Sequence, residues 1–138
     1  MILAALDGTD TDDDVTETAC HIAIASKSKM TLIFIIEIPR EYPVDVELHQ
    51  LTIRGEETLQ KMEKLSRKLK VKATGLIFQA RSKGTGVVAY SREQNANVLV
   101  LGIPNKSPYA SFSINRDVNY VLTNADCRVV TCRSSLVR

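Results

Sequence analysis

The sequence predicts a doubly wound α/β domain, in which a five-stranded parallel sheet carries helices on both faces. Strand-like and helix-like segments alternate along the whole chain, beginning and ending with a strand. The strand-like segments are continuous apolar runs, which is typical of strands buried on both faces. Right-handed crossovers between such strands place helices on both sides of the sheet. The 138 residues, 44% hydrophobic and 25% charged, favour a single domain over residues 1–138.

The first elements are two strands joined by a helix. Residues 1–6 form a short apolar strand that ends at Asp7. Residues 11–28 carry apolar side chains at helical spacing, and the acidic side chains at their start suit the positive end of a helix dipole. Residues 30–38 form a second apolar strand, which Pro39 ends.

The middle of the chain continues the alternation. Residues 40–46 follow Pro39 and contain Pro43, so they predict a loop. An amphipathic helix follows over residues 48–69, and residues 71–79 predict the third strand. Residues 85–95 predict a short helix, and residues 97–102 a fourth buried strand.

The last elements are a helix over residues 115–124 and a strand over residues 128–133, after a loop with two prolines. One glycine pattern, Gly84-Thr85-Gly86, stands before the predicted third helix. A lone GxG is a weak pattern, so we interpret it as a turn and helix start rather than as a phosphate cradle.

Composition and charge exclude several classes of protein. The net charge is only +2, with −3 in residues 1–78 and +5 in residues 79–138, so the second part is the better place for an anionic ligand. There is no P-loop and no GxGxxG after the first strand. Basic residues are scattered and aromatic residues make up 5%, which argues against nucleic acid as a partner. No apolar run approaches the length of a membrane span and no signal peptide is visible, so we expect a cytoplasmic protein.

The residues that could ligate metals are few. Cys20, Cys127 and Cys132 include no CxxC pair, and we expect three reduced, buried thiols. The two histidines, His21 and His49, are predicted to be surface or helix-face residues rather than ligands or catalytic bases. The sequence therefore predicts no metal site and no catalytic residue.

The carboxyl ends of the strands are the place where open parallel sheets bind ligands. In this chain those ends are predicted at Asp7-Gly8, Ile36-Glu37, Arg81-Ser82 and Gly102.

Several segments resemble the universal stress protein family. ILAALDGT at residues 2–9 is similar to the first strand and loop of that family, and TLIFIIEIP at residues 31–39 to its second strand. NVLVLG at residues 97–102 and the closing residues 118–133 are similar to later elements in the same order. The resemblance implies an adenine nucleotide alpha hydrolase-like fold with strand order 3-2-1-4-5, and a homodimer.

Many members of this family bind ATP or another adenine nucleotide through a glycine motif after the fourth strand. The motif has a glycine, a second one three residues later, nine further residues, and a glycine followed by Ser or Thr. At these positions the chain has Gly102, Asn105, Asn115 and Arg116, so the first glycine is kept and the other two glycines and the hydroxyl are replaced. Asparagine tolerates the left-handed backbone best among residues with a side chain, so the loop shape is compatible with the replacements.

The resemblance also implies which residues contact the nucleobase and ribose: Ala5, Asp7, Ile35, Leu101 and Gly102. No metal is expected beyond Mg²⁺ that accompanies a nucleotide. Two roles are open for Arg116 at a helix start: an ion pair with the adjacent Asp117, or binding of a phosphate together with Lys106.

The leading functional hypothesis is a non-enzymatic regulatory or stress-response protein that responds to an adenine nucleotide. One alternative is a regulatory domain or subunit of an amino-acid or ion transporter, because residues 35–48 and 79–88 are similar to stress-type domains attached to such transporters. A second alternative is a weak ATPase, although no base, P-loop or metal-ligand pair is visible.

The expected assembly follows from the last strand. In the order 3-2-1-4-5 this strand lies at an edge of the sheet, and exposed edges are usually covered or paired. The resemblance implies pairing with its copy across a two-fold axis, with Val129, Val130 and Cys132 near the interface.

Overall fold

Five parallel strands form one sheet at the centre of the molecule. The computed structural model describes residues 1–103 and 114–135. The strands lie side by side in the order β3-β2-β1-β4-β5, which confirms both the predicted fold class and the implied strand order. Their bounds are β1 Ile2–Leu6, β2 Met30–Glu37, β3 Ala73–Ala80, β4 Val98–Gly102 and β5 Arg128–Cys132.

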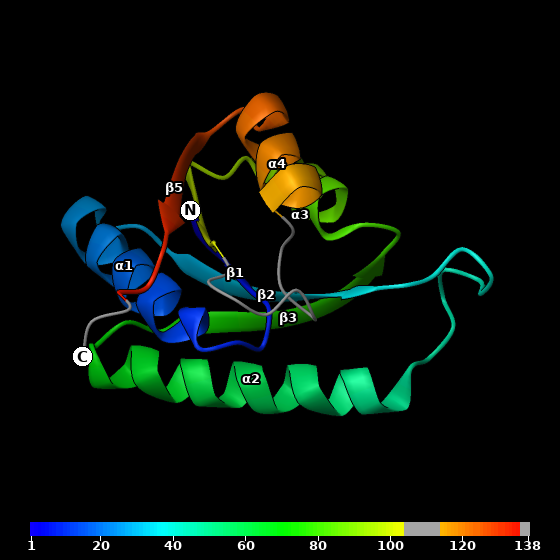
Figure 1. The fold of residues 1–138 in the computed structure, drawn as a ribbon. Coiled ribbons are helices and arrows are strands. Elements are labelled where there is room, and N and C mark those ends of the chain that lie inside the picture. The colour runs from blue at the N-terminus through cyan, green and yellow to red at the C-terminus, as the bar shows by residue number, and fades with distance from the viewer. Residues whose placement is uncertain (104–113, 136–138) are drawn as a thin grey trace.

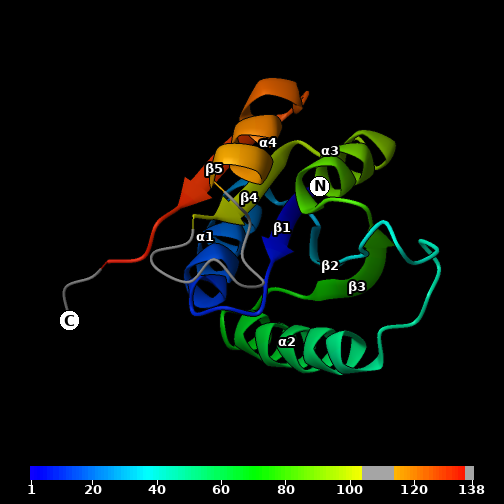
Figure 2. The same cartoon turned by 45° about the vertical axis from the view of Figure 1, so that its right-hand side comes forward.

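The helices cover the sheet on both faces (Figures 1 and 2). One face carries α1 and α2, which contact each other, and the other carries α3 and α4. A short π-helix, η1, runs directly into α4. The bounds are α1 Thr11–Ser26, α2 His49–Lys68, α3 Lys83–Glu93, η1 Ile114–Val118 and α4 Asn119–Asn124.

The burial of the strands explains their apolar sequences. Every residue of β1 and β4 is buried. In β1, Leu6 packs into the core under α1 and α2, while Leu3 and Ala5 pack into the core under α3 and α4. The edge strands β3 and β5 are only partly buried. Two-sided burial therefore produces the continuous apolar runs of the central strands.

Several helix boundaries differ by one or two residues from the sequence prediction, and hydrogen bonds explain two of these differences. Helix α1 ends at Ser26 rather than at residue 28, because Lys27 has a left-handed φ of 54° and the Ser28 N–H donates to the Ala23 carbonyl. Helix α3 begins at Lys83 rather than at residue 85, because the Ser82 hydroxyl caps it by accepting from the Thr85 N–H.

Gly84 and Gly86 therefore lie inside the first turns of α3, which confirms the predicted helix start, whereas no separate glycine turn precedes the helix. The segment 115–124 also differs, since it begins as the π-helix η1 and becomes α-helical only from Asn119.

The thiols and the helices add two observations. Cys20 is buried as predicted, but Cys127 and Cys132 are only partly buried, because they lie at or next to the edge strand β5; all three are free thiols.

Within the described residues, no helix combines the length and the apolar character needed to cross a lipid bilayer.

Candidate functional site

Six segments of the chain contribute charged residues near the carboxyl ends of the central strands. Asp7 directly follows β1, Glu37 ends β2, and Arg116 and Asp117 lie in η1, which precedes α4. Lys83 is the first residue of α3. We call these residues, with Asp12 of α1 and Arg54 of α2, the strand-end site.

The first part of this site is a pair of buried carboxylates, Asp7 and Asp12, which we call the acidic corner. Asp12 accepts from two backbone amides, the Asp7 N–H at 3.0 Å and the Gly8 N–H at 2.8 Å. Asp7 Oδ1 accepts from the Thr9 N–H at 3.0 Å. The other oxygen, Asp7 Oδ2, is buried and has no hydrogen-bond partner among the described residues when Asp12 is ionised. A buried carboxylate oxygen without a donor is costly, and so it marks a position where a ligand donor would be favoured.

The acidic corner holds a proton near neutral pH. Burial, and next the charge of Asp7, raise the pKa of Asp12 from 3.8 to about 7. Two backbone N–H donors act in the opposite direction but do not offset the burial. Asp12 is therefore about half protonated at pH 7.

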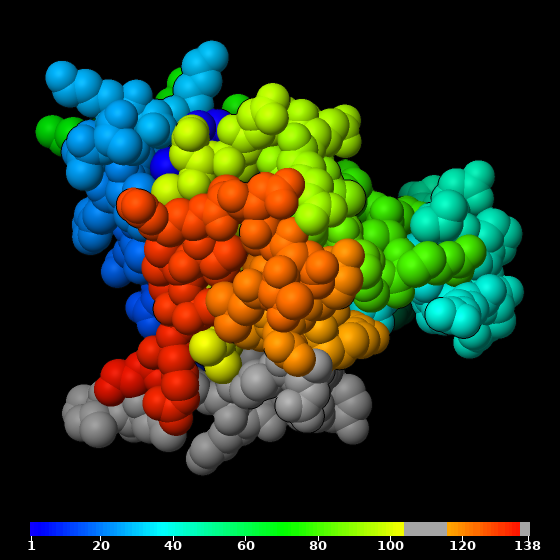
Figure 3. Space-filling model, turned by 90° about the horizontal axis from the view of Figure 1, so that it is seen from above, coloured from blue at the N-terminus to red at the C-terminus, as the bar shows by residue number. Residues whose placement is uncertain are grey.

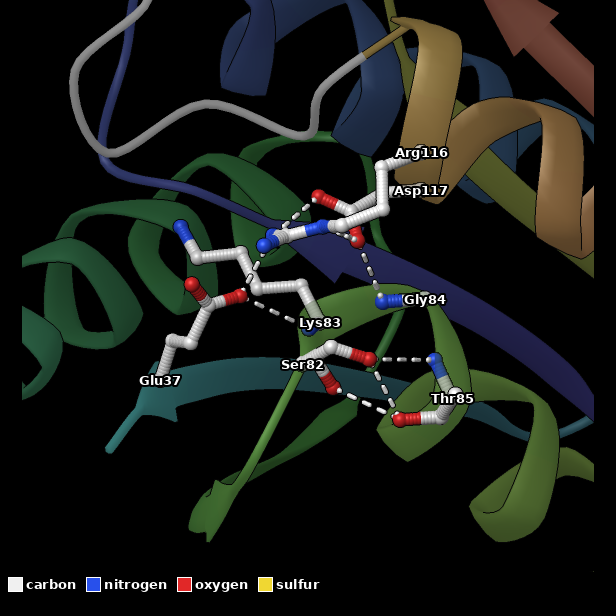
Figure 4. Close-up of polar contacts among 7 residues, drawn as sticks. All are labelled: Glu37, Ser82, Lys83, Gly84, Thr85, Arg116 and Asp117. Atoms are coloured by element: carbon white, nitrogen blue, oxygen red, sulfur yellow. Dashed lines mark hydrogen bonds and ion pairs between the residues drawn. The ribbon is translucent and has the colours of Figure 1, made fainter. Parts of the chain in front are cut away.

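The second part of the site is a cluster of ion pairs among Glu37, Arg116 and Asp117, which we call the ion-pair corner (Figure 4). The Arg116 guanidinium binds both Asp117 oxygens, with Nε to Oδ1 and Nη2 to Oδ2 at 3.0 Å each. Its Nη2 also donates to Glu37 Oε1 at 2.6 Å. The hydrogen bonds that Arg116 donates to Asp117 have the largest effect and raise the pKa of Arg116, while burial, the next effect, lowers it; the charge of Asp117 raises it further.

The same two carboxylates also occupy the first amides of α3 (Figure 4). The Lys83 N–H donates to Glu37 Oε1 at 3.2 Å, and the Gly84 N–H donates to Asp117 Oδ1 at 3.1 Å. A Cβ added at Gly84 would lie 3.0 Å from the Asp117 backbone, so the glycine permits this close approach. A helix N-terminus attracts anions through free amides and its dipole, and here the protein supplies those anions itself.

Lys83 connects the two corners. Its side chain is buried and extends on the Glu37 side of the cluster (Figure 4). Burial lowers the pKa of Lys83, while the charges of Asp7, Glu37 and Asp117 act to raise it. Since both corners influence this ammonium group, they belong to one electrostatic environment. Arg54 adds a further cation at the acidic corner, where its Nη2 donates to the Gly8 carbonyl at 2.9 Å.

The family of the chain follows from comparison with known proteins. A family model, the universal stress protein family, matches residues 1–133. The chain belongs to the universal stress protein family. No curated protein sequence matches it significantly.

Solved structures of universal stress proteins share this fold. One from Archaeoglobus fulgidus in complex with dAMP is 17% identical, with a TM-score of 0.75 over 94% of each chain. One from Arabidopsis thaliana with AMP bound is 13% identical, with a TM-score of 0.71, and covers 98% of this chain and 92% of that one. A third, in complex with cAMP, is 16% identical, with a TM-score of 0.73 over 97% and 96%. At these identities the likeness establishes the fold.

The structure brings part of the residue set implied by the universal stress protein family together. Ala5, Ile35 and Leu101 are buried in one core cluster, on the face covered by α3 and α4. Because these side chains are part of the core, a ligand at the strand ends would contact their backbone rather than their side chains. Gly102 ends β4, where an added Cβ would lie only 2.7 Å from Thr11 Oγ1.

The glycine motif of universal stress proteins is only partly visible. Asn105 lies outside the described residues, as does Lys106. Asn115 belongs to η1, and Arg116 is in the ion-pair corner with Asp117, the pairing that sequence alone left open. The second pairing of Arg116, with Glu37 at the end of β2, was not predicted.

Four further site residues were not predicted as functional: Asp12, Arg54, Lys83 and Glu37. The strand-end rule located Glu37 but assigned it no role. Ser82, with a hydroxyl suited to capping, was the signal that α3 begins at Lys83 and brings this lysine to the strand ends.

Proposed function

We propose that this universal stress protein is a regulatory module that binds an adenine nucleoside or nucleotide at the carboxyl ends of β1, β2 and β4. One observation carries the proposal: Asp7 is 2% exposed, and its Oδ2 has no donor among the described residues. A ribose hydroxyl or an adenine amino group is a donor of the required kind. Three structural neighbours are described as complexes with cAMP, dAMP or AMP, which supports the choice of adenine.

The role proposed is binding rather than catalysis. Asp12, whose pKa is raised to about 7, has the protonation behaviour of a general base. However, its two oxygens accept from backbone amides of the β1–α1 loop, which assigns it to holding that loop. We expect no phosphate release from ATP above the buffer rate in the presence of Mg²⁺.

Two measurements test the proposal. Mass spectrometry of the supernatant from denatured protein shows whether an adenine compound is carried through purification. Calorimetry with adenosine then compares the wild type with Asp7→Asn, which should bind about tenfold more weakly because a charge-assisted hydrogen bond becomes a neutral one. Asp126→Asn, at an exposed carboxylate, is the matched control and should bind as the wild type does. Equal affinity of all three proteins, or no binding of adenosine and AMP, would reject the proposal.

We also propose that the module is a homodimer that pairs through β5. This strand is an edge of the sheet, and it is open to view beside α4 in the space-filling picture (Figure 3). Val129, Val130 and Cys132 pack partly against the two cores and leave part of their surface accessible. Sedimentation of Val130→Lys should shift toward monomer, whereas Leu122→Lys on α4 should not. A wild type that is monomeric at micromolar concentration rejects this assembly.

A second candidate function is regulation of a membrane transporter. The loop between β2 and α2, residues 38–48, projects from the body of the molecule (Figure 1). Arg81 Nη1 anchors it by donating to the Pro39 and Tyr42 carbonyls at 2.7 Å. Tyr42 and Val44 of this loop are exposed, as a contact surface requires.

Co-purification from solubilised membranes tests this second candidate. A tagged chain should retain a transporter, and the double variant Tyr42→Ser and Val44→Ser should lose it. Leu122→Ser, at an equally exposed apolar residue of α4, is the control. Absence of any membrane protein in the wild-type sample would reject the candidate.

A further inference from the structure

The groups that would bind a phosphate chain already hold carboxylates of the protein itself. Glu37 accepts from the Lys83 N–H and from Arg116 Nη2, and Asp117 accepts from the Gly84 N–H and the Arg116 guanidinium. Two backbone amides at a helix start and one arginine are a typical set for phosphate binding. In this chain these donors already bind the carboxylates of Glu37 and Asp117.

The charge around the site also disfavours a polyphosphate. Among the described residues, four carboxyl groups belong to the strand-end site, against three cations, and a proton partly neutralises Asp12 near pH 7. The acids are Asp7, Asp12, Glu37 and Asp117, and the cations are Lys83, Arg54 and Arg116. A single phosphate can share the half-exposed Arg116 guanidinium, whose side chain is 56% exposed. A triphosphate would bring at least two more negative charges close to Glu37 and Asp117.

We propose that the strand-end site selects adenine ligands with no more than one phosphate, nucleosides and nucleoside monophosphates included, and that Glu37 is the residue that excludes longer phosphate chains. The inference rests on the proposed function, since it concerns the ligand class of the same site. Glu37 is the better candidate than Asp117 for this role because its side chain is 33% exposed, whereas that of Asp117 is 1% exposed and part of the core structure.

Calorimetry with adenosine, AMP and ATP, in EDTA so that Mg²⁺ does not mask phosphate charge, tests the proposal. The wild type should bind AMP at least about tenfold more tightly than ATP, a ratio that corresponds to one added like-charge contact at close range. Glu37→Gln keeps the shape and an acceptor for the Lys83 N–H but removes the charge. It should bring ATP to within about threefold of AMP, with adenosine as the reference ligand that carries no phosphate.

A control variant and a salt series show whether the charge of Glu37, rather than the shape of the site, causes the preference for AMP over ATP. Glu47→Gln removes a carboxylate from the exposed loop after β2 and should keep the wild-type ratio. Raising the salt from about 0.05 M to about 0.5 M should narrow the AMP-to-ATP ratio of the wild type, because exposed charges are screened within a few ångströms at high salt.

Four results would overturn the inference. Wild-type binding of ATP as tight as that of AMP rejects the selectivity and leaves adenine binding intact. An unchanged ratio in Glu37→Gln, or an equal change in Glu47→Gln, rejects the role of Glu37. No binding of adenosine or AMP to the wild type rejects this inference together with the proposed function.

Discussion

The two corners of the strand-end site differ in how they compensate the charge of a buried carboxylate. Both contain a carboxylate that is almost fully buried, Asp12 in the acidic corner and Asp117 in the ion-pair corner. An arginine and a backbone amide bind Asp117 and compensate its carboxylate charge. Asp12 also accepts from two amides, but its burial and then the charge of Asp7 raise its pKa to about 7, so it reduces its charge by holding a proton.

The difference indicates what each corner can offer to a ligand. The acidic corner has an acceptor without a donor, Asp7 Oδ2, and gains from a ligand that brings an N–H or O–H group. The ion-pair corner has already matched its cation and helix amides with internal anions, so a ligand anion must compete with them. Hence the first corner favours binding and the second limits what is bound.

The largest expected effect is the loss of the buried acid of the ion-pair corner. Asp117→Ala leaves the Gly84 amide and the Arg116 guanidinium without this partner, and we expect the free energy of unfolding to fall by about 3 kcal/mol. Asp126→Ala breaks an exposed pair, with Arg92 and Asp126 side chains 49% and 73% exposed, and should cost less than about 1 kcal/mol. Urea unfolding measures both, and equal losses would contradict the contrast between buried and exposed pairs.

The next effect is a pH dependence that arises in the acidic corner alone. Because the pKa of Asp12 is raised in the folded state from 3.8 to about 7, the folded protein binds more protons than the unfolded chain between these values. Stability should therefore be highest below about pH 4 for this group and fall by a few kcal/mol as the pH rises to about 7.

Asp12→Asn should remove this slope, although it also lowers stability at every pH because an amide nitrogen cannot accept from a backbone N–H. Unfolding curves at several pH values, taken as the difference between wild type and variant, isolate the contribution. If Asp12→Asn keeps the full slope, the proton is held elsewhere.

A smaller loss of stability is expected from a change in the backbone of the loop whose two amides donate to Asp12. Gly8 has a φ of 80°, so Gly8→Ala should lower stability by about 1 kcal/mol. Lys27, which follows α1, has a positive φ of 54° without being a glycine. The reverse substitution, Lys27→Gly, should therefore leave stability equal or raise it slightly. Thermal unfolding of both variants checks the pair, and a neutral Gly8→Ala would show that the loop can relax.

The smallest effect is expected for the exposed member of the ion-pair corner. Glu37→Gln removes a pair whose side chains are 56% and 33% exposed, so stability should change by less than about 1 kcal/mol. Equilibrium unfolding in urea is sufficient to measure it. A loss as large as that of Asp117→Ala would mean that the two carboxylates act as one buried unit.

The sequence by itself determined the fold of this protein. Continuous apolar runs such as residues 30–36 predict strands buried on both faces, and the helices between them predict a parallel sheet. The strand-end rule placed Asp7 and Gly102 correctly at the carboxyl ends of β1 and β4. These predictions succeed because hydrophobic burial sums over many residues, so an error at one position changes little.

Only the tertiary structure decided how the charges pair. Glu37 and Arg116 are 79 positions apart, and the Gly84 amide and Asp117 are 33 apart, with no local pattern that links them. A hydrogen bond depends on tenths of an ångström and on the exact start of α3 at Lys83, which were set by packing of whole elements. The unmatched oxygen of Asp7 was likewise beyond sequence, since burial without a donor is a property of the folded surroundings and not of the residue.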